Sequence, residues 1–253
     1  RRAFGAMSVT GQPKYREPFE PLLPGAKFVP VRDEKALEAA VSDNTCAIIL
    51  EIIQGEGGIV PICERMIRKA RALADRHNAL LIFDEIQCGV GRPGTYFAYQ
   101  LFDPIVMGDI VVMAKPIACG LPLGAILANE KAAANLTAGM HGSTYGGGPL
   151  ATRVALEFFE VLDELMPAIN SVGSYFRMRL TELSRRHAFI KEVRGTGLMI
   201  GVELSIPGKS MVAEGIERGV LFNCTHDTVL RFLPPYILTE QDVDLAVERL
   251  DAI

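Results

Sequence analysis

The chain has 253 residues, of which 49% are hydrophobic, and its formal net charge is −4. This length suits one large domain, or a large domain with a small one, and the hydrophobic content is enough for a sizeable core. The weak negative charge, with no run of Lys or Arg, argues against nucleic acid and anionic membranes as main partners.

Five cysteines are scattered along the chain, at positions 46, 63, 88, 119 and 224. They form no CxxC pair and their number is odd, so we expect neither a disulfide framework nor a metal site. This usage favours a reducing cytosol, and the sequence shows neither a signal peptide nor the roughly 18 apolar residues of a membrane span. Residues 1–8 read like sequence from the middle of a domain, so we expect the chain to be a fragment.

Apolar runs in the first half predict strands at residues 46–53, 80–83, 110–113 and 124–128. Between the first two runs, residues 64–78 carry apolar side chains on one helical face. Strand, helix and strand at this spacing are typical of a βαβ unit in a parallel sheet.

The second half has a different pattern. Pro149 stands where a helix can begin, its apolar stripe ends at Leu165, and a second helix is expected over residues 172–183. Thr239 is the expected N-cap of a closing helix. Short strand-like pieces lie between these helices, at residues 190–193, 198–204 and 229–233.

We therefore predict an α/β protein with two domains. Residues 1–164 would form a large domain around a mostly parallel sheet, and residues 165–253 would form a smaller α+β domain.

Polar groups end two of the predicted strands. Asp84 and Glu85 follow one apolar run, and Lys115 ends the next. Ligands gather at the carboxyl ends of parallel strands, so a carboxylate and an amine should meet at one rim of the sheet. Such a pair is either a structural ion pair or a Schiff-base lysine facing the carboxylate partner of a pyridinium nitrogen. The spacing alone favours the ion pair.

Two glycine-rich segments are less specific. Residues 89–94 match GxGxxG, but Pro93 predicts a loop in place of the helix that a dinucleotide site opens. Residues 141–149 combine hydroxyls and glycines just before a predicted helix, and such a segment offers donors to an anion, typically a phosphate.

Arg231 interrupts an apolar strand and needs a partner, because an unpaired buried charge is very costly. The partner is either a substrate carboxylate or an internal one. Glu56, in the glycine-rich residues 54–58, is the internal candidate. This segment is either a simple turn or a flexible loop at the sheet rim.

Together these segments resemble the class III, fold-type I, pyridoxal-phosphate-dependent aminotransferases, and within that family the acetylornithine aminotransferases. The segments that carry the resemblance are GAMSVTGQPKY (5–15), EIIQGEGGIVP (51–61), LLIFDEIQCGVGRPG (80–94), AKPIACGLPLGA (114–125), HGSTYGGGPLA (141–151) and RGTGLMIG (194–201).

The resemblance implies how matching residues would hold pyridoxal 5′-phosphate. Lys115 would bond covalently to the cofactor and later shuttle the proton, and Asp84 would keep the pyridinium nitrogen protonated. Ile86 would pack against one face of the ring, and Gln87 would bond the phenolic oxygen of the ring.

It also implies shared sites and substrate contacts. Ser143 and Thr144 resemble the phosphate-binding pair that the family supplies from a neighbouring subunit, so a homodimer is expected. Arg231 would clamp the substrate α-carboxylate, and Glu56 would release it when a dicarboxylate enters. Arg2 stands where the family has an arginine for the distal carboxylate of 2-oxoglutarate.

The sequence departs from the family pattern in places. Arg1-Arg2-Ala3 replaces a motif of the type Gly-Arg-Thr, Cys88 stands where Thr is common, and Pro116 stands where Ala is common. A cofactor-phosphate loop and a ring-stacking aromatic residue of the family have no counterpart in this chain.

The implied reaction moves an amino group from N-acetylornithine, or a related ω-amino donor, to 2-oxoglutarate and gives glutamate, in arginine biosynthesis. One alternative is an ornithine or 4-aminobutyrate aminotransferase. Another is a truncated, catalytically silent chain that dimerises. A nicotinamide dehydrogenase would use residues 89–94 and would not need Lys115.

Overall fold

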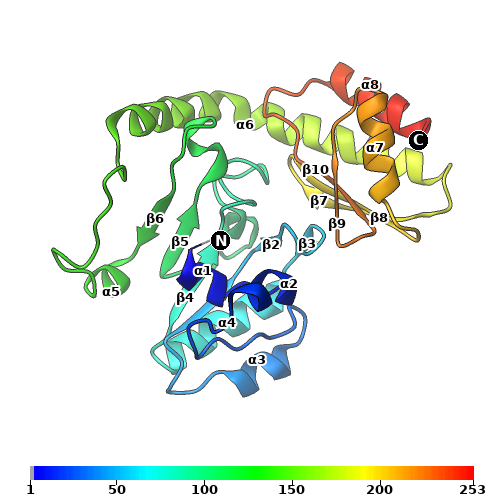
Figure 1. Ribbon diagram of the computed structural model, residues 1–253. Coiled ribbons are helices and arrows are strands. Elements are labelled where there is room, and N and C mark those ends of the chain that lie inside the picture. The colour runs from blue at the N-terminus through cyan, green and yellow to red at the C-terminus, as the bar shows by residue number, and fades with distance from the viewer. Residues whose placement is uncertain (1–2) are drawn as a thin grey trace.

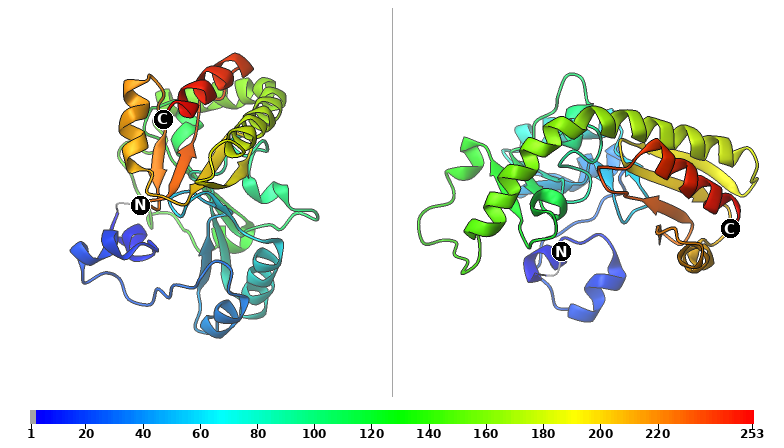
Figure 2. Two further views of the ribbon diagram at one scale, coloured as in Figure 1. Left: turned by 90° about the vertical axis from the view of Figure 1, so that its right-hand side faces the viewer. Right: turned by 90° about the horizontal axis from the view of Figure 1, so that it is seen from above.

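The structure is a computed structural model that describes residues 3–253. Two four-stranded sheets stand side by side, and the long helix α6 (Pro149–Ser184) runs from one to the other (Figure 1). The view from above in Figure 2 shows α6 lying along both units. No helix of the described residues is long and apolar enough to cross a membrane.

The first sheet has the order β1-β4-β5-β6. Strands β1 (Ala47–Leu50), β4 (Leu80–Asp84) and β5 (Ile110–Met113) are parallel, and β6 (Ala125–Ala128) pairs antiparallel with β5. Helix α4 (Glu64–Arg76) lies between β1 and β4 in the chain and packs against them. The predicted α/β fold with a mostly parallel sheet is confirmed.

The two faces of this sheet differ in burial. Leu81 and Phe83 are buried in the core shared with α4, whereas Ile49 and Ile126 on the opposite face are exposed. Parallel sheets are normally covered on both faces. The open face therefore leaves space beside the carboxyl ends of β4 and β5.

The second sheet is antiparallel and has the order β7-β8-β10-β9. Its core contains side chains of α6 and of α8 (Glu240–Asp251). Thr239 is the N-cap of α8, as predicted, and its hydroxyl accepts the N–H of Asp242 at 3.2 Å. The strands are β7 (Ile190–Thr196), β8 (Met199–Leu204), β9 (Asn223–Thr225) and β10 (Val229–Phe232).

The prediction of two helices after Pro149 is wrong, because α6 is a single helix of 36 residues. Its buried stripe continues past Pro167, with Phe158 in one core and Val172 in the next. Packing on both sides offsets the hydrogen bond that a proline cannot donate. The predicted division between residues 164 and 165 falls inside this helix, and the domain boundary stays a prediction.

The sequence patterns missed several short elements. Helix α7 (Lys209–Glu217) buries only Gly215, so it lacks the apolar stripe by which helices are recognised. The two-residue strands β2 (Ile53–Gln54) and β3 (Val60–Pro61) pair with each other. The remaining elements are α1 (Phe4–Ser8), α2 (Pro13–Arg16), η1 (Glu17–Phe19), α3 (Glu34–Ala40), η2 (Ala98–Leu101), η3 (Lys115–Ala118) and α5 (Glu130–Ala133).

Close packing of α6 on the β7–β8 turn gives a stability prediction. Alanine is favoured over glycine in a helix by about 1 kcal/mol, but a Cβ at Gly173 would overlap the backbone of Gly197. Gly173→Ala should therefore destabilise the protein by about 1–3 kcal/mol in urea unfolding. Ser174→Ala, at an exposed position of the same helix, is the control and should change stability by less than about 0.5 kcal/mol. Equal midpoints for the two variants would contradict the predicted clash.

Candidate active site

Asp84 and Lys115 lie at the same rim of the first sheet. Asp84 is the last residue of β4 and pairs in parallel register with Val112 of β5. Lys115 follows β5 after one residue and begins the short helix η3. Strand order and register therefore bring the carboxylate and the amine to one edge, as the apolar runs predicted.

The backbone around both residues is constrained. The Asp84 carboxylate accepts the N–H of Ile86 at 3.1 Å, which fixes the turn after β4. Lys115 has φ of 57°, in the left-handed region that a residue with a side chain rarely adopts. Such strain persists where surrounding structure enforces it, and it clusters at functional sites.

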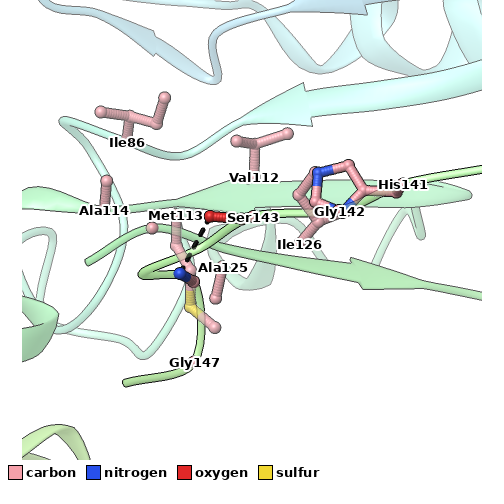
Figure 3. Close-up of a pocket in the computed structure, with 12 residues that line it drawn as sticks. Ile86, Val112, Met113, Ala114, Ala125, Ile126, His141, Gly142, Ser143 and Gly147 are labelled. Atoms are coloured by element: carbon pink, nitrogen blue, oxygen red, sulfur yellow. Dashed lines mark hydrogen bonds between the residues drawn. The ribbon is translucent and has the colours of Figure 1, made fainter. Parts of the chain in front are cut away.

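A pocket of about 660 Å³ opens beside these strand ends. Ile86, from the turn after Asp84, forms part of its wall near the segment that carries Ser143 (Figure 3). The Ser143 hydroxyl accepts the N–H of Gly146 at 2.9 Å, which shapes this segment just before α6. The lining residues are Ile86, Val112, Met113, Ala114, Gly124, Ala125, Ile126, His141, Gly142, Ser143, Gly146 and Gly147.

Not every predicted site residue lines this pocket. Of the predicted residues within 3–253, Ile86 and Ser143 line it. The others do not contribute to its wall: Glu56, Asp84, Gln87, Lys115, Thr144 and Arg231. Arg2 lies outside the described residues.

The second sheet contributes Arg231, on β10, and the first unit contributes its partner. Arg231 Nη1 donates to Glu56 Oε1 at 2.7 Å and to Gln87 Oε1 at 3.1 Å. Its Nη2 donates to Asn223 Oδ1 at 3.2 Å. Glu56 is thus the internal carboxylate that a buried arginine requires. Asn223 was missed because β9 is too short to be recognised from its sequence.

Arg231 keeps one unused donor. Its Nε is buried and has no hydrogen-bond partner among the described residues. A carboxylate can engage two N–H groups of a guanidinium at once, whereas Glu56 engages only Nη1 here. The arginine is therefore able to take a second carboxylate.

Opposing effects set the pKa of Glu56. Burial raises this pKa, but the hydrogen bond and charge of Arg231, the hydrogen bond of Gln87 and the charge of Lys115 together outweigh burial. The net result is a pKa below the ordinary value of glutamate. Glu56 is therefore ionised at neutral pH, and Lys115 is near enough to act on it electrostatically.

Glu85 has a separate, structural part. It points to the face opposite Asp84, is fully buried, and accepts the N–H groups of Ala98 at 2.8 Å and Tyr99 at 2.9 Å. Burial raises the pKa of its carboxyl, and the two N–H donors offset only part of that rise. Glu85 therefore holds the chain after the rim in place.

The structure thus has an α/β sheet with a carboxylate and a lysine at one rim and an arginine from a second sheet, the arrangement that the resemblance implied. A family model described as Aminotransferase class-III matches residues 2–253. The chain therefore belongs to the class III aminotransferase family, as the resemblance indicated.

Curated and solved relatives agree with this assignment. The acetylornithine aminotransferase of Methanocaldococcus jannaschii is 44% identical over 254 residues, which cover 100% of this chain and 63% of that protein. A Toxoplasma gondii ornithine aminotransferase structure, described with partial occupancy of PLP at its active site, has a TM-score of 0.91 and 33% identity, covering 100% of this chain and 61% of its own. The structure of N-acetylornithine aminotransferase from Stenotrophomonas maltophilia has a TM-score of 0.82 and 33% identity. The match covers 91% of this chain and 62% of that one. The chain spans about 63% of the length of its curated relatives.

The Glu56–Arg231 contact predicts a titration shift. Arg231→Ala should raise the pKa of Glu56, because burial then acts without the guanidinium that outweighs it. Glu56 would take up its proton at a higher pH than in the unmodified chain, as ¹³C NMR of the side-chain carboxyl can measure. Arg231→Lys keeps a positive charge and should shift the titration less. An unshifted curve for the alanine variant would show that other groups keep Glu56 ionised.

Proposed function

We propose that this chain is part of a pyridoxal-phosphate-dependent aminotransferase that moves an amino group from N-acetylornithine to 2-oxoglutarate. The observation that carries the proposal is Arg231, with one unused donor, paired to Glu56 next to the rim that holds Asp84 and Lys115. The position of the pair supports the proposal, because Gln87, three residues after Asp84, bonds the same guanidinium and the charge of Lys115 acts on Glu56.

The residues present fit the cofactor. The pocket volume of about 660 Å³ lies within the range of small-molecule sites, roughly 300–1,000 Å³. Ile86 supplies an apolar wall for a ring. The segment from Ser143 to Gly147 has N–H groups and a hydroxyl, and it would supply them to the phosphate site of a second copy of the chain. This segment leads directly into α6, whose N-terminus favours an anion such as a phosphate.

When bound, pyridoxal phosphate would supply an electron-accepting ring for proton removal beside the amino nitrogen. The Asp84 carboxylate would hold a proton on the ring nitrogen. Lys115 Nζ would carry the proton from one carbon to another, which requires an amine that can be neutral. Gln87 would orient the ring from the same rim.

Arg231 and Glu56 would manage two different substrates in turn. Arg231 would bind the α-carboxylate of an amino or keto acid through its planar fork of donors. Glu56 would pair with Arg231 while no substrate carboxylate is bound. Its side chain would turn away when a dicarboxylate binds to the guanidinium. The 2.7 Å contact between Glu56 and Arg231 in this structure is consistent with the paired state.

The proposed donor follows the curated relatives. Acetylornithine aminotransferases are 40–44% identical to this chain. Ornithine is the second candidate donor, because a solved ornithine aminotransferase superposes with a TM-score of 0.90 over 100% of the chain. A coupled assay with each donor separates the two, and the preferred donor has the higher kcat/KM.

A homodimer with shared sites is part of the proposal. Tyr145, Leu150 and Leu156 are 90%, 70% and 62% exposed, and they lie on and just before the first turns of α6. Large exposed apolar side chains close together in the chain favour a contact with another protein. A second copy of the chain suits this surface because the same segment carries Ser143 and Thr144. The predicted cytosolic location stays a prediction.

Lys115→Ala should lower transamination by at least about 10²-fold, because proton transfer by a positioned side chain contributes on that scale. Glutamate formation measures the loss, and the urea midpoint checks that the variant is folded. Lys69→Ala, which removes only a surface pair with Glu38, is the control and should retain activity. Borohydride reduction with added pyridoxal phosphate should label Lys115 in the unmodified chain. Turnover that survives in Lys115→Ala would refute the assignment.

Shared sites predict recovery of activity on mixing two inactive variants. A chain with Ser143→Ala and Thr144→Ala would lack the phosphate pair, and a Lys115→Ala chain would lack the lysine. Mixed dimers made by co-expression would hold one complete site if the pair reaches across the interface, so glutamate formation should return. If both variants dimerise but the mixture stays inactive, each chain builds its site from its own Ser143.

A further inference from the structure

The loop of residues 55–59, here called the Glu56 loop, is fastened to the second sheet at Glu56 and after it. The Thr225 hydroxyl on β9 donates to the carbonyl oxygen of Glu56 itself at 2.7 Å. Arg194 on β7 donates from Nε to the carbonyl oxygens of Gly58 and Ile59, each at 3.0 Å. Its Nη2 donates to Gly58 as well, at 2.6 Å.

Close packing fixes the same loop against strands β8 and β10. Ile59 is fully buried, and its φ of 52° lies in the left-handed region. A Cβ at Gly201 of β8 would lie 2.9 Å from the Ile59 side chain, and one at Gly58 would lie 3.1 Å from Val229 of β10. The backbone of the loop therefore has little room to shift relative to the second sheet.

The arginine that fastens the loop is itself held firmly. Arg194 pairs with Glu203 at 2.7 Å and with Glu192 at 2.9 Å, and its side chain is only 12% exposed. Burial raises the pKa of Glu203, but the hydrogen bond and charge of Arg194 outweigh it, so the pKa lies below its ordinary value. The ion pair thus stays charged at neutral pH and keeps the guanidinium aimed at the loop.

The other end of the loop is held by the first unit. The N–H of Gly55 donates to Glu51 Oε2 at 2.9 Å, and a Cβ at Gly55 would overlap the Gln87 side chain. The backbone is therefore fixed before, at and after Glu56, while the Glu56 carboxylate projects to Arg231.

We propose that Arg194 is a positioning residue that fixes the Glu56 loop to the second sheet, so that Glu56 releases Arg231 by turning its side chain while its backbone stays in place. The inference rests on the proposed function of Arg231 as a carboxylate clamp. It adds that the exchange of Glu56 for a substrate carboxylate needs no opening of the loop. It also assigns a role to Arg194 of the RGTG segment, for which neither cofactor binding nor substrate binding has been proposed.

The test uses two readouts on the full chain, one of which does not depend on catalysis. Hydrogen–deuterium exchange measures protection of the amides in residues 55–59. The dissociation constant for glutarate, a dicarboxylate that cannot react, measures how strongly Glu56 competes for Arg231. The variants are Arg194→Ala and Thr225→Val, each alone and combined with Glu56→Gln. Arg249→Ala removes another arginine bond to a carbonyl, that of Gly219, and is the matched control.

Arg194→Ala should raise exchange at least about tenfold in residues 55–59 and leave exchange in β4 and β5 unchanged. Glu56→Gln should lower the dissociation constant for glutarate, because the carboxylate that competes for Arg231 is gone. Arg194→Ala should lower the same dissociation constant by a smaller factor, because a mobile loop holds Glu56 less firmly against Arg231. In the Glu56→Gln background Arg194→Ala should have no further effect, and Arg249→Ala should resemble the unmodified chain throughout. Thr225→Val should change exchange and glutarate affinity in the same directions as Arg194→Ala. If Arg194→Ala does not fold, the Thr225→Val measurements test the proposal in its place.

Unchanged exchange in both anchor variants would overturn the proposal. So would a change in glutarate affinity that is the same with and without Glu56, because Arg194 would then act through another residue. If glutarate binds neither the unmodified chain nor Glu56→Gln, the clamp role of Arg231 fails and the proposal that rests on it fails too. The exchange data would then still show whether Arg194 holds the loop.

Discussion

The buried positive charge of Arg231 is the constraint on which the arrangement of the two units depends. A guanidinium removed from water needs a carboxylate, and the second sheet offers it only Asn223 at 3.2 Å. Its carboxylate partner, Glu56, comes from the first unit, so the two units must meet where these groups lie. Packing of the second sheet against the first unit therefore also forms the Glu56–Arg231 pair.

The alternation of side chains along a strand explains why two adjacent acids differ so much. Asp84 and Glu85 follow one another, but Asp84 faces the open side of the sheet and Glu85 is buried under Ala98 and Tyr99. One register step thus separates a carboxylate on the open face from one that is buried and bonded to two backbone N–H groups. A slip of β4 by one residue would exchange these environments.

Sequence reasoning found the features that depend on local pattern. The apolar runs located β4 and β5, and parallel pairing then brought Asp84 and Lys115 to one rim. The need to neutralise a buried arginine pointed to Glu56. The contact between Arg194 and Gly58 could not be predicted, because it joins residues 136 apart and involves backbone carbonyls that no side-chain pattern reveals. The continuity of α6 was missed because Pro167 reads as a helix breaker, and only the two cores explain why the helix persists.

Helix α6 has a mechanical consequence for the whole chain. With 36 residues it is about 54 Å long at 1.5 Å per residue, and its side chains belong to both cores. A rotation of one unit against the other would have to bend this rod or pull it out of a core, and both are costly in a close-packed interior. The helix therefore works as a rigid spacer that sets the separation between the sheet rim and Arg231. The distance between the carboxyl ends of β4 and β5 and Arg231 therefore depends on a helix that lies outside both sheets.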